Sequence, residues 1–151
     1  MKTGVLFNDF GKTDKNYQIM TSMNQFVKTR TDELCAFIMN VSHKIINTDF
    51  AYINISDVSH FNDGLLIATS IDTADVLSKT STTSKKCLYL WSIDWLGQAV
   101  VYNGIKRILS DKNLKIITRS QLQADIIKNN YNVDAVVLEE FDVEKINEIC
   151  S

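Results

Sequence analysis

The string WSIDW is the most distinctive candidate for chemistry in the chain, because Trp91 and Trp95 flank Asp94. Indole faces stack on sugar rings and on bases, and a carboxylate accepts hydrogen bonds from hydroxyl groups. We therefore expect Ser92, Asp94 and Trp95 to contact a hydroxylated acceptor, with Asp94 as a candidate catalytic carboxylate. In the structural alternative, which is the more common outcome for tryptophans, Trp91 lies in the core and Trp95 packs under the following helix.

The loop NDFGK follows the first apolar run and holds three further candidates, Asn8, Asp9 and Gly11. Asp9 could remove the proton from an attacking hydroxyl, and Asn8 and Gly11 could contact the substrate. An aspartate in such a loop is more commonly a turn former. The loop has one glycine and so lacks the backbone amides with which GxGxxG or a P-loop binds phosphates. We therefore expect neither NAD nor FAD, and no other cofactor.

Arg119 and Ser120 lie between an apolar run and the start of an amphipathic segment. A strand end followed by a helix N-terminus can hold an anionic group such as phosphate, so both residues are candidates for substrate binding. Capping of the helix by the Ser120 hydroxyl explains half of this pattern without any ligand.

The two histidines, His43 and His60, have no carboxylate or cysteine at a spacing typical of metal ligands, so we expect no metal site. His60 and Asp57 could form an acid/base pair if both faced a cleft. A histidine at the surface is the more common outcome.

Composition excludes several classes of protein. The net charge of -2 gives no basic footprint for a nucleic-acid backbone, and the longest apolar run, residues 34–39, is far shorter than the roughly 20 residues of a membrane span. Cys35, Cys87 and Cys150 are odd in number and without paired spacing, which indicates free thiols in a reducing compartment. We expect one cytoplasmic domain over residues 1–151.

The stretch from Leu114 to Phe141 reads as strand, helix, strand. Residues 114–117 form a short β-branched run, Ser120 fits a helix N-cap, and Asn129 with Asn130 suits a helix end. The face of this helix is expected to comprise Leu122, Ile126 and Ile127. Residues 135–138 resume as a second buried strand, and two parallel strands require such a crossover.

The rest of the chain repeats this alternation. Strands are predicted at residues 4–8, 34–39, 50–56, 64–70 and 87–91. Helices are predicted from Asp14 (with Tyr17, Met20, Met23 and Phe26 or Val27 on one face), from Ser70 or Asp72, from Gly97 (with Val100, Ile105, Ile108 and Leu109) and over 143–149. The pattern predicts a Rossmann-like three-layer α/β/α fold, with a mostly parallel sheet and helices on both faces. Ligands in such folds bind outside the carboxyl ends of the strands, where the polar candidates gather.

Three segments carry a family resemblance, namely GLLIATSIDTADVL (64–77), CLYLWSIDWL (87–96) and IITRSQLQADIIKNNYNVDAVVLEEF (116–141). Together they resemble the N-terminal Rossmann-like domain of GT-B glycosyltransferases, including phage-type enzymes. The resemblance implies a glycosyltransferase-like domain that binds a sugar acceptor or a nucleotide-sugar. In GT-B enzymes a C-terminal half holds most contacts to the donor, and here only the helical tail FDVEKINEICS follows.

The missing donor half leads to two hypotheses. In the first, the chain is an acceptor-side half that acts with a partner supplying the second domain, or a degenerate remnant. In the second, it is a non-enzymatic interaction module on the same fold, which forms a homo-oligomer or binds another protein through an orphaned apolar face. A small flavodoxin-like or nucleoside-processing enzyme is a third alternative.

Overall fold

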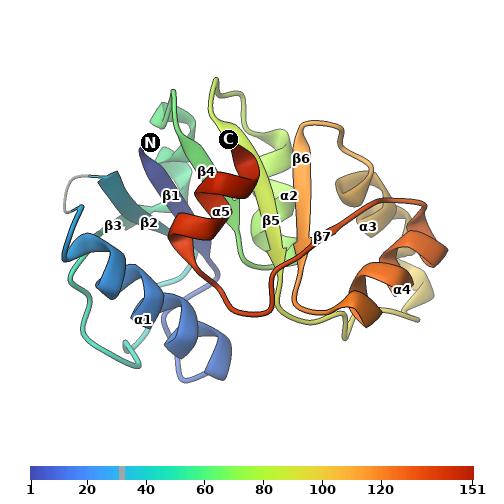
Figure 1. Ribbon diagram of the computed structural model, residues 1–151, viewed down its shortest axis with the longest axis horizontal. Helices are drawn as coiled ribbons and strands as arrows, with labels where there is room; N and C mark the ends of the chain where they lie inside the picture. The colour runs from blue at the N-terminus through green and yellow to red at the C-terminus, as the bar shows by residue number, and fades with distance from the viewer. Residues whose placement is uncertain (31–32) are drawn as a thin grey trace.

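The computed structural model describes residues 1–30 and 33–151, and in this part of the chain seven strands form one sheet (Figure 1). All neighbouring strands are parallel, in the order β3-β2-β1-β4-β5-β6-β7. The strands are β1 (Thr3–Phe7), β2 (Leu34–Ile38), β3 (Ala51–Asn54), β4 (Leu65–Ala68), β5 (Lys85–Leu90), β6 (Leu114–Thr118) and β7 (Val136–Val137). The predicted three-layer α/β fold is therefore confirmed.

Helices cover both faces of the sheet because the central strands are apolar on both sides. In β1, Val5 and Phe7 pack into one core cluster with α1 (Asp14–Val27) and α5 (Val143–Cys150), and Leu6 packs into the other cluster. The second cluster lies under α2 (Ile71–Lys79), α3 (Tyr102–Leu109) and α4 (Gln121–Tyr131). Figure 1 shows α1 and α5 on the near face of the sheet, with α2 behind it.

The sheet changes its direction of growth between β1 and β4. From β1 the chain runs through α1 to β2 and β3 on one side, and from β4 it runs through α2 to β5, β6 and β7 on the other. Because α1 and α2 lie on opposite faces, the loops after β1 and β4 diverge there. A crevice at such a switch point, outside the carboxyl ends of the strands, is the usual binding place in this fold.

Three apolar side chains predicted to face the core are exposed instead: Tyr17 (51%), Val100 (99%) and Leu122 (69%). Val100 lies in the 3-10 turn η3 (Ala99–Val101), because α3 begins only at Tyr102. The other residues predicted for these faces are buried or half-buried: Met20, Met23, Phe26 and Val27 in α1, Ile105, Ile108 and Leu109 in α3, and Ile126 and Ile127 in α4. In α1 the buried residues are Asn16, Ile19, Met20, Met23, Phe26 and Val27, and in α4 they are Ala124, Ile127 and Tyr131.

Two helix boundaries also differ from the prediction. The N-cap of α1 is Thr13 and not Asp14, since the Thr13 hydroxyl oxygen accepts a hydrogen bond from the amide of Asn16 (3.1 Å). The carboxyl end of α4 is Asn132, in the left-handed conformation (φ 55°), three residues after Asn129. Asparagine tolerates that conformation better than most residues.

The strand predicted over residues 135–138 was expected to be buried, and that expectation was wrong. Only Val136 and Val137 pair with β6, and both are exposed because β7 is the last strand of the sheet. The strand predicted over 50–56 is shorter as well, since η2 (Ile55–His60) follows β3 directly. Prediction was better for the central strands, which have neighbours on both sides.

All three cysteines are free thiols, with Cys87 buried and Cys35 and Cys150 half-buried. Burial raises the pKa of Cys35 to about 11. In the part of the chain that the structure describes, we find no helix with the length and apolar character needed to cross a membrane.

Candidate functional site

A cavity of about 370 Å³ opens at the carboxyl ends of β4 and β5, next to the switch point. Its apolar floor includes Leu90 at the end of β5 and Ile105 of α3. The polar and aromatic residues of the lining include Lys15, Ser70, Asp72, Trp91, Ser92, Asp94 and Trp95. Three of these, Ser92, Asp94 and Trp95, are substrate-binding candidates from the sequence. We call this space the carboxyl-end cavity.

Asn8 connects the ends of β1 and β4 beside the carboxyl-end cavity. Its side-chain oxygen accepts a hydrogen bond from the Ser70 hydroxyl (2.5 Å), and its side-chain nitrogen donates to the Asp72 carboxylate (3.0 Å). Ser70 is also the N-cap of α2, in a capping box with Thr73. The three residues therefore form a polar bridge across the switch point. This bridge orients Asp72 toward the site from the first turn of α2.

Asp9 and Gly11 shape the loop after β1 and do not line the carboxyl-end cavity. The Asp9 Oδ1 atom accepts a hydrogen bond from the amide of Gly11 (2.7 Å) and a longer one from the side chain of Asn16 (3.3 Å). A β-carbon at Gly11 would lie 2.9 Å from Asp9 Oδ1, so glycine allows the tight turn. The turn-forming alternative weighed for Asp9 accounts for these contacts.

The WSIDW loop lines the cavity, as the binding hypothesis predicts, and also packs against the protein, as the structural alternative predicts. The Ser92 hydroxyl donates a hydrogen bond to Asp94 Oδ1 (2.9 Å), which fixes the carboxylate at the cavity. Trp95 lines the cavity, and its ring also makes an edge contact with Tyr131 of α4 at 5.9 Å between ring centroids. Trp91 is half-buried against the core. The two indoles are thus held by packing and present part of their surface to the cavity.

Arg119 and Ser120 lie outside the lining of the carboxyl-end cavity. The Ser120 hydroxyl oxygen accepts a hydrogen bond from the amide of Gln123 (3.2 Å), so it caps α4 as the alternative reading expected. Arg119 is directed at Trp91 and donates from Nε to the backbone oxygen of Glu139 (3.3 Å). Arg119 therefore packs against Trp91, which lines the cavity.

Lys15 is a charged residue of the cavity that was not predicted from the sequence. Burial lowers the pKa of its ammonium group, and the carboxylates of Asp9, Asp72 and Asp94 oppose that shift. A cation in the first turn of a helix is unfavourable because that end carries the positive pole of the helix dipole. Lys15 is the second residue of α1. A lysine in this unfavourable position was the sequence feature that could have identified it as a site residue.

The histidines contribute nothing to this site. His43 and His60 are both exposed, and neither lines the carboxyl-end cavity. No cluster of three or more metal-ligand side chains occurs within residues 1–30 and 33–151.

Comparisons with protein-family models, with curated proteins and with solved structures found no match to the chain. The chemistry of the site must therefore be argued from its geometry. Two carboxylates, two indoles, two serine hydroxyls and one ammonium group around 370 Å³ suit a ligand with several hydroxyl groups and an apolar ring face.

Proposed function

We propose that the carboxyl-end cavity binds a sugar, and that the chain is the acceptor-side domain of a GT-B-like glycosyltransferase. The observation that supports this most directly is the placement of Trp91 and Trp95 with Asp72 and Asp94 around one cavity. An indole covers the apolar face of a sugar ring, and carboxylates accept the hydrogen bonds of its hydroxyls. The donor-binding half would lie outside residues 1–151.

In this proposal Asp94 is the general base for the acceptor hydroxyl. Its Oδ1 atom is held by Ser92, and Asp94 lines the cavity. Asp9 is the less suitable base, because its Oδ1 atom is committed to the loop. Lys15 would donate a hydrogen bond to the ligand and balance the charge of the nearby carboxylates.

Calorimetric titration with maltose and glucose tests the proposal, with UDP-glucose as the donor-type probe. We expect a saccharide to bind and Asp94→Asn to weaken binding about tenfold, the usual effect of losing a hydrogen bond to a charged group. Asp125→Asn is the matched control, because Asp125 lies on the exposed side of α4 and bonds only locally to Gln121. Equal affinities for both variants would contradict the proposal, as would tight binding of UDP-glucose by the chain alone.

A second candidate function, self-association, is favoured by the outer edge of the sheet. All four residues of β3 are exposed, including Tyr52 (41%) and Ile53 (46%), and β3 pairs only with β2. A two-fold axis beside β3 would pair it with β3 of a second copy in antiparallel orientation. That pairing would satisfy the free backbone groups and cover both side chains.

Sedimentation velocity at micromolar concentration tests this second candidate. We expect a dimer that Ile53→Lys converts to a monomer, because a lysine on an edge strand opposes pairing. Val100→Lys, at a fully exposed position in η3, should leave the dimer intact. A wild-type chain that sediments as a monomer overturns the proposal.

A further inference from the structure

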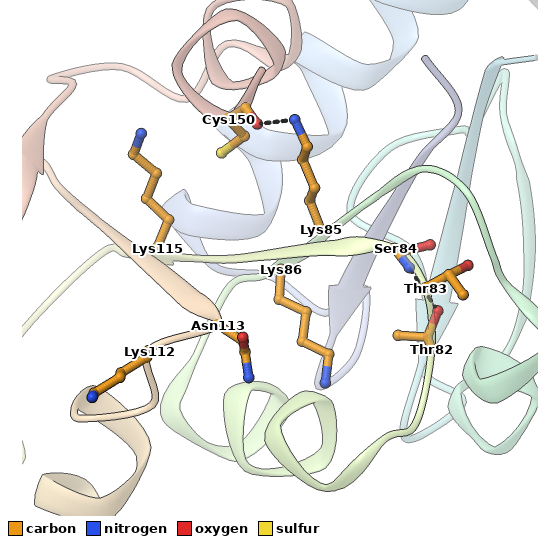
Figure 2. Close-up of a pocket in the computed structure, with 9 residues that line it drawn as sticks. All are labelled: Thr82, Thr83, Ser84, Lys85, Lys86, Lys112, Asn113, Lys115 and Cys150. Carbon is orange, nitrogen blue, oxygen red and sulfur yellow. Dashed lines mark hydrogen bonds between the residues drawn. The ribbon is translucent and has the colours of Figure 1, made fainter.

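A second cavity, of about 660 Å³, lies at the amino ends of β5 and β6, at the opposite end of the strands from the carboxyl-end cavity (Figure 2). Four of its nine lining residues are lysines: Lys85, Lys86, Lys112 and Lys115. The remaining five carry no carboxylate side chain. A chain with a net charge of -2 thus concentrates four of its 16 basic residues at one place, which we call the basic cavity.

Two of these lysines hold the last helix. The Lys85 ammonium donates hydrogen bonds to the backbone oxygens of Cys150 (2.9 Å) and Ser151 (2.7 Å). The Lys115 ammonium donates to the backbone oxygen of Ile149 (2.6 Å). Cations are stabilising at this end of a helix, because its last carbonyl groups form the negative pole of the dipole. Lys85 and Lys115 are therefore explained by the fold.

Lys86 and Asn113 point to the opposite side of the strands, and Lys112 extends away from both of them (Figure 2). The Lys86 ammonium donates one hydrogen bond, to the backbone oxygen of Thr80 (2.7 Å), and so keeps two donor hydrogens. Lys112 is exposed on the turn after α3. In the described part of the chain, ion pairs with side-chain carboxylates form at Lys79 and Lys128 but at none of the four cavity lysines.

We propose that the basic cavity binds a small ligand that carries two or more phosphate groups. Lys86 and Asn113 would hold one phosphate, and Lys112 would hold another, through hydrogen bonds that are charge-assisted at the lysines. The positive charges of Lys85 and Lys115 would attract the remaining charge of the ligand. A phosphate group suits this role because it brings nearly two negative charges and three acceptor oxygens.

The size of the basic cavity favours a small molecule over a nucleic acid. A volume of 660 Å³ is within the usual range for sites that bind small ligands. The 12 basic residues outside this cavity are outnumbered by 18 acidic ones, so the chain offers no continuous positive track for a long phosphate backbone. This assignment does not depend on the sugar site, because the two cavities share no lining residue.

Calorimetric titration with inorganic tripolyphosphate at low ionic strength tests the proposal. We expect binding that weakens as salt is added, because salt screens the attraction between exposed charges. The double variant Lys86→Gln/Lys112→Gln should raise the dissociation constant about tenfold or more, since two hydrogen bonds to charged groups are lost. The matched control is Lys28→Gln/Lys106→Gln, which removes the same charge at exposed positions outside the cavity.

Three results would overturn the proposal: no binding of tripolyphosphate, equal weakening in both double variants, or tighter binding of a single-stranded oligonucleotide at equal phosphate concentration. Equal weakening would mean that only the total charge of the protein matters. Should the Lys86→Gln/Lys112→Gln variant unfold, Lys112→Gln alone provides the test, because that side chain is exposed.

Discussion

The guanidinium group of Arg119 lies over the indole of Trp91, with its Cζ atom 3.8 Å from the centre of the ring. Arg119 follows β6 and Trp91 follows β5, so the contact joins the ends of two neighbouring strands. Gln123 adds a hydrogen bond from its side chain to the backbone oxygen of Trp91 (3.4 Å) and accepts one from the amide of Arg119 (2.8 Å). The orientation of a cavity wall thus depends on the first turn of α4.

A double-mutant cycle measures the energy of this contact. We expect Arg119→Ala and Trp91→Leu to be coupled by about 0.5–1 kcal/mol in the free energy of unfolding, the usual range for a cation over an aromatic ring near the surface. Urea denaturation gives the four values. Arg30→Ala with Trp91→Leu is the control and should be additive, because Arg30 lies beyond α1 and contacts Phe26 and Glu144. Additivity of the first pair would show that the ring contact contributes nothing.

Replacement of Lys15 should make the protein more stable. Lys15 is partly buried in the first turn of α1, where a cation is unfavourable by about 0.3–1 kcal/mol. Lys15→Met should therefore raise the free energy of unfolding at neutral pH by about that amount and weaken saccharide binding. Lys28→Met, at the other end of the same helix, should lower stability, because a cation is favourable there. Equal signs for the two variants would contradict this assignment.

Two glycines should respond to alanine in opposite directions. A β-carbon at Gly64 would lie 2.5 Å from the backbone oxygen of Lys2, which accepts the hydrogen bond of Leu65 between β1 and β4. Gly64→Ala should lower the free energy of unfolding by about 1–3 kcal/mol, since a backbone atom must move. A β-carbon added at Gly104 in α3 would have no atom within 4 Å apart from its chain neighbours and the backbone of the helix. Gly104→Ala should therefore raise the free energy of unfolding by about 0.5–1 kcal/mol. Thermal and urea unfolding of both variants check the signs.

Stability should fall at alkaline pH through Tyr89. Burial raises the pKa of its hydroxyl from 10.0 to about 12, and the hydroxyl donates to the backbone oxygens of Leu138 and Glu139 (3.2 Å each). Because the folded state favours the neutral form, this contribution is complete below about pH 10 and is lost as the pH rises toward about 12. Tyr89→Phe should lower stability by about 1 kcal/mol at neutral pH and flatten the decline between about pH 10 and 12. Urea unfolding across this pH range measures both effects, and parallel curves for the two proteins would contradict the prediction.

The central strands could be predicted because several consecutive residues in each of them are apolar. Leu65 to Ala68 and Leu88 to Leu90 are apolar on both faces, as a parallel sheet between two helical layers requires. The periphery could not be predicted in the same way. Leu122 and Val136 are apolar but exposed. The hydrophobicity of a side chain does not determine whether another helix or strand packs against it. Coverage depends on how the elements pack.

The candidate site was predictable where one loop carries it. Ser92, Asp94 and Trp95 are adjacent in the sequence and lie together in the carboxyl-end cavity. Lys15 and Asp72 come from the starts of two other helices, and only the sheet order brings them to Asp94. Asp72 had been considered as a helix cap and among the polar residues that follow a strand. The basic cavity was missed for the same reason, because its lysines come from β5, β6 and the turn between α3 and β6.

Both ends of the chain meet at the amino ends of the strands. The side chain of Thr3 donates a hydrogen bond to that of Asn147 in α5 (3.1 Å), and Lys85 contacts the backbone of Ser151. A tag, reporter or fused domain attached after Ser151 would consequently emerge beside the basic cavity, which Cys150 lines. It would leave the tryptophan-lined one, at the far end of the sheet, open to solvent.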